Sequence, residues 1–168
     1  MGDAALTFGR NAQRPIQGTE SGGIARVETG NNVFARLLAA LYGFPRAGEQ
    51  VPVKVSFQRR DDGELWQRDF AGRKFSTFQS EGRGYADKLL VERFGPVIFG
   101  MALVLTGGEL HLVIRRWSVF GIPLPLAFAP DASAYEYAEG DDFCFHVEVK
   151  HWLMGLIVRY DGELQVVN

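Results

Sequence analysis

The chain has 168 residues, of which 46% are hydrophobic and 23% charged, and its formal net charge is -2. This length fits one domain around a single core, and the scattered charges include no basic stripe that would bind a nucleic acid. Cys144 is the only cysteine, which excludes an internal disulfide or a CxxC motif and favours a reducing, cytoplasmic location.

The chain begins with residues that predict little regular structure. Residues 1–22 are polar and glycine-rich and carry no export signal, so we expect a flexible tail followed by a single domain at 23–168. A short β-like segment at 24–27 predicts one edge strand before the chain breaks at Gly30.

A short helix is predicted next. Asn31 or Asn32 can cap its first turn, Gly43 and Pro45 end it, and one apolar stripe recurs at helical spacing through Phe34, Leu37, Leu38 and Leu41. Because so short a helix is unstable alone, we expect this stripe to pack on a sheet. A membrane surface is the less favoured alternative, since Arg36 is the only cation on the polar side.

From residue 51 onwards the pattern is that of β-strands. Apolar and polar residues alternate at 51–57 and again at 143–149, which places apolar side chains on one face. Further strands are predicted at 64–70, 73–80, 89–94, 97–105, 109–117 and 134–138, and a final hairpin is predicted from 154–160 and 163–167 with its turn at Asp161 and Gly162. The apolar run at 97–105 is much shorter than the roughly 20 residues of a membrane-spanning helix.

The strands follow one another without helical crossovers, which indicates antiparallel neighbours. We therefore predict a mainly β (α+β) fold: an antiparallel meander of about 8–10 strands that forms a curved sheet or a closed barrel, with one short helix near the N-terminus. Closure would leave no exposed edge strands.

Short motifs lie in three parts of the chain: LYGFP at 41–45 followed by VPVKV at 51–55; ERFGP at 92–96 with Arg116, Trp117 and GIPLP at 121–125; and GLIVRY at 155–160. In order and spacing they resemble the bacterial family of domain of unknown function 4166, over residues 23–164. Members are sometimes joined to a saccharopine-dehydrogenase-like nucleotide-binding domain, so the resemblance implies a dehydrogenase as a candidate partner. This chain has no GxGxxG motif of its own.

No catalytic or metal-binding motif is present. A GxSxG elbow is absent, and among the three histidines His146 shares a strand face with a carboxylate, Glu148. We expect no metal, no cofactor and an unreactive Cys144.

Arginines among aromatic and apolar residues are the strongest functional signal. A buried guanidinium must meet a carboxylate, for example Glu92, Glu109 or Glu148, or a bound anion, unless it points outwards. The candidate ligand-binding residues are Trp66, Arg68, Arg93, Arg116, Trp117 and Arg159.

These observations lead to three hypotheses. The first is a non-enzymatic binding domain for an amphipathic or lipid-like small molecule, such as a fatty acid, in a barrel lined by Phe99, Met101, Leu103, Leu112 and Ile114. The second is an enzyme, or an accessory domain, acting with a nucleotide-dependent oxidoreductase, which would need His146, Glu148 and an arginine in one deep pocket. The third is a protein-interaction module using the apolar loop 121–130, which otherwise would cover a core opening as a lid.

Overall fold

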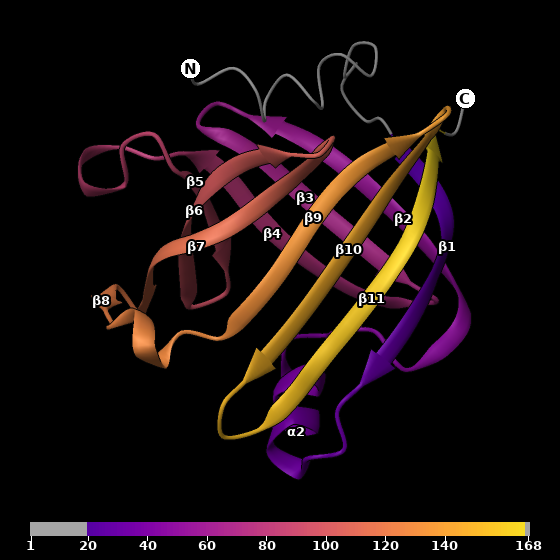
Figure 1. The fold of residues 1–168 in the computed structure, drawn as a ribbon, viewed down its shortest axis with the longest axis horizontal. Coiled ribbons are helices and arrows are strands. Elements are labelled where there is room, and N and C mark those ends of the chain that lie inside the picture. Colours follow the sequence, from indigo (N-terminus) through magenta and orange to yellow (C-terminus); the bar gives the residue numbers. More distant parts are fainter. Residues whose placement is uncertain (1–19, 167–168) are drawn as a thin grey trace.

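The computed structural model describes residues 20–166, and these residues form a closed antiparallel β-barrel (Figure 1). Neighbouring strands follow the chain order, and pairing of β6 with β7 and of β1 with β11 completes the ring. The two-residue β8 extends only from β7, so ten strands make up the barrel, as the alternation and short turns predicted. The strands are β1 (Glu20–Thr29), β2 (Gly48–Arg60), β3 (Gly63–Phe70), β4 (Arg73–Glu81), β5 (Leu90–Phe94), β6 (Val97–Thr106), β7 (Glu109–Val119), β8 (Ile122–Pro123), β9 (Asp131–Glu139), β10 (Asp142–His151) and β11 (Gly155–Val166).

The first strand differs from its prediction. β1 is not a short edge strand at 24–27 but a long strand paired with β2 on one side and β11 on the other. The expected tail, 1–22, lies outside the described residues except for Glu20, Ser21 and Gly22, which open β1. The glycine-rich composition of this segment did not indicate that it would pair with β11, which is distant in the sequence, as well as with β2.

The predicted turn at Asp161 and Gly162 is also wrong, because β11 runs through it without interruption. Gly162 lies opposite Ala25 in the register with β1. A Cβ atom on Gly162 would overlap the carbonyl oxygen of Ile24, so the glycine permits close approach of two backbones rather than a turn.

The helix α2 (Val33–Leu41) forms where it was predicted. The Asn32 side chain accepts a hydrogen bond from the Phe34 N–H at 2.9 Å, and Gly43, with φ of +72°, follows the last turn. Its orientation is not the expected one. The small residues Ala35 and Ala39 pack on Ile157 of β11, while the apolar stripe through Leu37 faces outwards.

The stripe faces outwards because alanine side chains allow the helix to lie close to β11, and the larger side chains on the other face then find no partner. Phe34, Leu37 and Leu41 are 70%, 66% and 79% exposed. Leu38 alone of the predicted stripe turns towards the barrel interior. Within the described residues no helix has the length and hydrophobicity needed to cross a bilayer.

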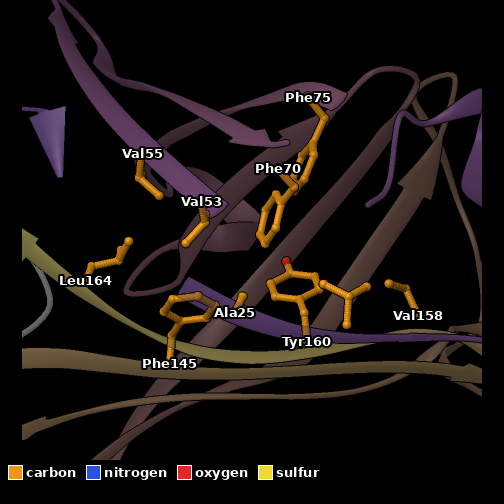
Figure 2. Packing of buried hydrophobic residues seen from close by; sticks show 10 residues of the cluster. Ala25, Val53, Val55, Phe70, Phe75, Phe145, Val158, Tyr160 and Leu164 are labelled. Atoms are coloured by element: carbon orange, nitrogen blue, oxygen red, sulfur yellow. The ribbon is translucent and has the colours of Figure 1, made fainter. Parts of the chain in front are cut away.

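The main hydrophobic cluster is built from residues of only some of the strands, and Figure 2 shows how its side chains face one another. Its buried residues come from β1, β2, β3, β4, β10 and β11, with Val53, Phe70 and Val158 at most 2% exposed. The ring of Tyr160 packs edge-on against Phe70, with centroids 5.2 Å apart, and its hydroxyl points into the interior. None of the cluster's buried residues belongs to β5, β6, β7 or β9, so the inward side chains of these four strands are not part of the packed core.

Candidate ligand-binding cavity

The barrel encloses a cavity of about 350 Å³ beside the packed cluster. This volume lies at the lower end of the range of roughly 300–1,000 Å³ typical of small-molecule sites. Most of the lining is apolar, and its larger apolar residues from the strands include Phe75, Phe94, Val97, Phe99, Met101, Leu112, Ile114, Trp117, Phe145, Val147 and Val149. The cavity is therefore suited to hold a hydrocarbon group.

Two short seams, where neighbouring strands pair over only a few residues, explain why this half of the barrel contains a cavity. β4 pairs with β5 only over 78–81, and β7 pairs with β9 only over 110–112. Beyond these pairs the strands separate towards the end of the barrel where α2 lies. Inward side chains on separated strands do not interdigitate, so space remains between them.

The loop 121–130 covers part of the opening between β7 and β9. Its residues Phe128 and Pro130 line the cavity, and the Trp117 indole N–H donates a hydrogen bond to the Pro125 carbonyl oxygen at 3.0 Å. Ile122 and Leu126 remain exposed. The loop thus covers the interior on one side and presents apolar residues to the outside on the other.

A polar cluster centred on Arg68 lies within the cavity wall. The Arg68 guanidinium donates a hydrogen bond to Thr77 Oγ1 at 2.9 Å and lies 3.7 Å from a carboxylate oxygen of Glu92. Gln79 donates to the same Glu92 oxygen at 3.3 Å. The guanidinium also lies over the rings of Trp66 and Phe75, at 5.2 and 5.4 Å from their centroids. Arg68 is therefore held in place, with its charge paired by one carboxylate.

Two further ionisable groups from other strands complete this polar region. Burial raises the pKa of Glu136 from 4.5 to about 7, against the opposing effect of the Arg68 charge, and the Glu92 charge raises it further. The Glu136 side chain keeps some accessible surface because it borders the cavity, but protein surrounds it. Burial likewise raises the pKa of Tyr160 to about 12, so its hydroxyl stays protonated. No described residue forms a hydrogen bond with either side chain, which leaves both able to bond a ligand.

Three of the predicted site residues lie at or beside the cavity. Arg68 and Trp117 line it, and Trp66 lies against the Arg68 guanidinium. The Trp66 ring packs edge-on against Phe57, and its buried indole N–H has no hydrogen-bond partner among the described residues.

The other three predicted residues lie outside the barrel. Arg93 and Arg116 are exposed, and the Arg116 guanidinium lies 6.0 Å from the centre of the Tyr85 ring. Arg159 is on the outer face, where it pairs with Glu148 and with Glu28, as the carboxylate-pairing alternative anticipated for Glu148. The structure does not bring these arginines to the cavity.

Sequence reasoning found much of the apolar lining but missed part of the polar region. Of the five residues predicted to line the barrel, all except Leu103 border the cavity. Glu136 and Tyr160 were missed. On β9 the two tyrosines lie on one face and Glu136 lies among alanines on the other, so the pattern did not reveal that Glu136 points inwards beside Phe145.

The residues that an enzymatic site would need are not assembled. The side chains of His146 and Glu148 alternate with the inward Phe145 and Val147, and of these two residues His146 borders the cavity whereas Glu148 does not. His146 stacks on Tyr135 with centroids 4.8 Å apart, while Glu148 pairs with Lys150 and Arg159. Among residues 20–166 no three potential ligand side chains of His, Cys, Asp or Glu converge in a way that could hold a metal ion.

The fold and the cavity define an up-and-down β-barrel with a mostly apolar interior and a buried polar cluster. Within that class the chain belongs to the family described as Domain of unknown function (DUF4166), which matches residues 12–164 and thus confirms the resemblance in the motifs. No curated protein matches the chain.

Two solved structures are similar in outline. The zebrafish ileal bile acid-binding protein complexed with cholic acid is 10% identical, with 90% of this chain and 97% of that chain covered and a TM-score of 0.35. A putative thioesterase II from Thermobifida fusca YX is 9% identical, with 97% and 84% covered and a TM-score of 0.24. Scores this low transfer neither ligand nor activity.

Proposed function

We propose that this protein is a non-enzymatic binding protein that holds an amphipathic small molecule inside the barrel. The observation that supports this most directly is the combination of an apolar cavity of about 350 Å³ with one buried polar cluster on its wall. An apolar chain would fill the hollow half of the barrel, and a single polar group would reach Arg68, Glu92, Glu136 and Tyr160.

The charges of this cluster favour a particular kind of polar group. Arg68 is already paired with Glu92, and Glu136 is a second carboxyl whose pKa, raised to about 7, keeps part of it protonated at neutral pH. A ligand carboxylate would have to approach two carboxyl groups, whereas a hydroxyl or amine could donate a hydrogen bond to Glu136. We therefore infer that the ligand is an alcohol or an amine rather than the fatty acid that the arginines among apolar residues suggested.

The alternative of an enzyme, or an accessory of a dehydrogenase, depends on His146 and Glu148 in one pocket with an arginine. His146 borders the cavity, but Glu148 does not and pairs with Arg159 instead, so the three groups do not share one pocket. The binding role is the function that the geometry supports best.

The test is a set of three probes with the same hydrocarbon chain: decanol, decylamine and decanoate. Binding is measured by calorimetry at neutral pH. We expect decanol and decylamine to bind and decanoate to bind at least about tenfold more weakly, because the Glu92 carboxylate and the ionised fraction of Glu136 repel it. Equal or stronger binding of decanoate would contradict the inferred head group.

A pair of tryptophan variants tests where the probes bind. Leu112 lines the cavity, whereas the next residue, Val113, faces outwards on the same strand. Leu112→Trp should fill the cavity and abolish binding of decanol, and Val113→Trp should leave it unchanged. If neither variant affects binding, or if no probe binds the wild type, the proposed function is wrong.

A further inference from the structure

Most of the large exposed apolar side chains of the described residues are gathered at one end of the barrel. Of fourteen large hydrophobic residues that are exposed, four are in α2, four lie in 120–128, and two are Trp152 and Leu153 in the β10–β11 turn. These segments lie together along the lower side of Figure 1. So large an apolar area rarely stays uncovered in a folded protein.

The charges of the strand connections at this end are all positive. The connections 30–47, 71–72, 95–96, 120–130 and 152–154 contain Arg36 and Arg46 and no carboxylate. Both arginines are exposed, and neither pairs with a carboxylate of the described residues. The apolar end is therefore also the cationic end, with a charge of +2 in its connections.

The opposite end has the reverse character. Its connections, 61–62, 82–89, 107–108 and 140–141, contain four aspartates and two cations, Arg83 and Lys88, which sum to -2. Only Tyr85 among the exposed large hydrophobic residues lies in one of these connections. The molecule thus has one end that an anionic apolar surface would attract and one end that it would repel.

The cavity reaches the apolar end. Leu38 and Tyr42, on the inner side of α2 and its C-terminal cap, line the cavity, as do Phe128 and Met154 from the other two segments. Their neighbours Leu37 and Leu153 face outwards. The same three segments therefore border the interior on one side and present apolar residues to the surroundings on the other.

We propose that this end of the barrel docks on the surface of a bilayer containing anionic phospholipid. Phe34, Leu37, Leu41 and Trp152 would enter the boundary between headgroups and acyl chains, and Arg36 and Arg46 would lie among the lipid phosphates. A protein partner would require apolar complementarity but no anionic surface, whereas the charge difference between the two ends fits a lipid headgroup layer. Docking is independent of which ligand, if any, the cavity holds.

The experiment is flotation of the protein with two kinds of vesicles. One contains equal parts of phosphatidylglycerol and phosphatidylcholine, and the other contains phosphatidylcholine alone. We expect the wild type to float with the anionic vesicles and to bind the neutral ones about tenfold more weakly, because two arginines contribute to binding. Arg36→Glu combined with Arg46→Glu should remove this preference.

Two leucine variants provide a matched control. Leu37 on α2 is 66% exposed, and Leu105, near the β6–β7 turn at the opposite end, is 65% exposed. Leu37→Asp should weaken binding to anionic vesicles about tenfold or more, since a charge replaces an inserted apolar side chain. Leu105→Asp, which makes the same chemical change at equal exposure, should bind as the wild type does. Thermal unfolding of both variants establishes that each is folded.

Three outcomes would overturn docking on a bilayer. They are absence of the wild type from floated anionic vesicles, equal loss of binding in the two leucine variants, and a dimer in light scattering that Leu37→Asp converts to a monomer without vesicle binding. The last outcome would assign the apolar end to contact between copies of this chain. Binding of decanol without vesicle binding would leave the proposed ligand cavity intact, so the two proposals fail separately.

Discussion

The two halves of this barrel use similar side chains for different purposes. In the half formed by β1, β2, β3 and β11, Val53, Phe70 and Val158 are almost completely buried and interlock with Tyr160. In the half formed by β5, β6, β7 and β9, Phe99, Leu112 and Ile114 are only half-buried, because they face the cavity. Hydrophobicity alone does not distinguish a packed core from a binding cavity; the pairing of the strands does.

The physical difference is the length over which neighbouring strands pair. β1 pairs with β2 and β11 along nearly its whole length, which holds inward side chains at the spacing needed for interlocking. The two short seams, β4–β5 and β7–β9, let strands diverge in the other half. Stability should therefore depend mostly on the first half and binding on the second.

The largest expected effect comes from removing the same aromatic ring in each half. Phe70→Ala should lower the free energy of unfolding by about 4 kcal/mol, because it opens a new cavity in the packed half. Phe99→Ala should cost only about 1–2 kcal/mol, because its ring already borders empty space. Urea titration of both variants measures the difference, and equal losses would remove the distinction between the halves.

The close approach of β1 and β11 gives the next effect. Gly162→Ala should destabilise the protein by about 3 kcal/mol, because the new methyl group would overlap the backbone at Ile24 and Ala25. Glu163→Ala, a change at the adjacent exposed residue, should have an effect below about 0.5 kcal/mol and serves as the control. If Gly162→Ala left the free energy of unfolding unchanged, the backbones of β1 and β11 could move apart without loss of packing in this half.

In the half that contains the cavity, the contribution of Glu136 to stability should depend on pH. Because Glu136 has a pKa of 4.5 when unfolded and about 7 when folded, the folded state keeps a proton that the unfolded chain has lost between these values. Stability from this group is complete below the lower value and falls as pH rises towards the upper one. Glu136→Gln should therefore raise the free energy of unfolding by about 1–3 kcal/mol at about pH 8 and by much less at about pH 5.

Urea titrations of the wild type and Glu136→Gln at the two pH values measure this effect. Glu109→Gln, at a strand end near the surface, is the control and should change stability little at either pH. An equal effect of Glu136→Gln at both pH values would place its carboxyl in water rather than in the barrel interior.

The smallest effect concerns α2, which borders both halves through Ala35 on β11 and Leu38 at the cavity. Asn32→Ala should cost about 1 kcal/mol or less, because it removes the cap of the first turn. Asn31→Ala makes the same change one residue earlier and should be neutral, since it is Asn32 that accepts the capping hydrogen bonds. Faster release of decanol from Asn32→Ala would identify α2 as the element that opens the cavity.

The amino-acid sequence by itself determined most of the strands, the position of the helix and most of the strands' inward faces. Alternation of apolar and polar residues along β2 and β10 is a local signal, because successive side chains of a strand point to opposite faces. The same is true of Asn32 and Gly43, whose roles at the two ends of α2 depend only on neighbouring backbone atoms. Because the turns between strands are short, neighbouring strands are antiparallel, and closure into a barrel leaves no edge strand exposed.

Only the tertiary structure decided the features that depend on contacts between distant segments. Gly162 lies in a strand because β1, far away in the sequence, approaches it, and the stripe of α2 faces outwards because Ala35 and Ala39 fit better against β11. In β7 an irregularity in the register with β6 leaves both Arg115 and Arg116 exposed and returns Trp117 to the cavity. Local patterns carry no information about such pairings, since they are set by backbone contacts that form only when the barrel closes.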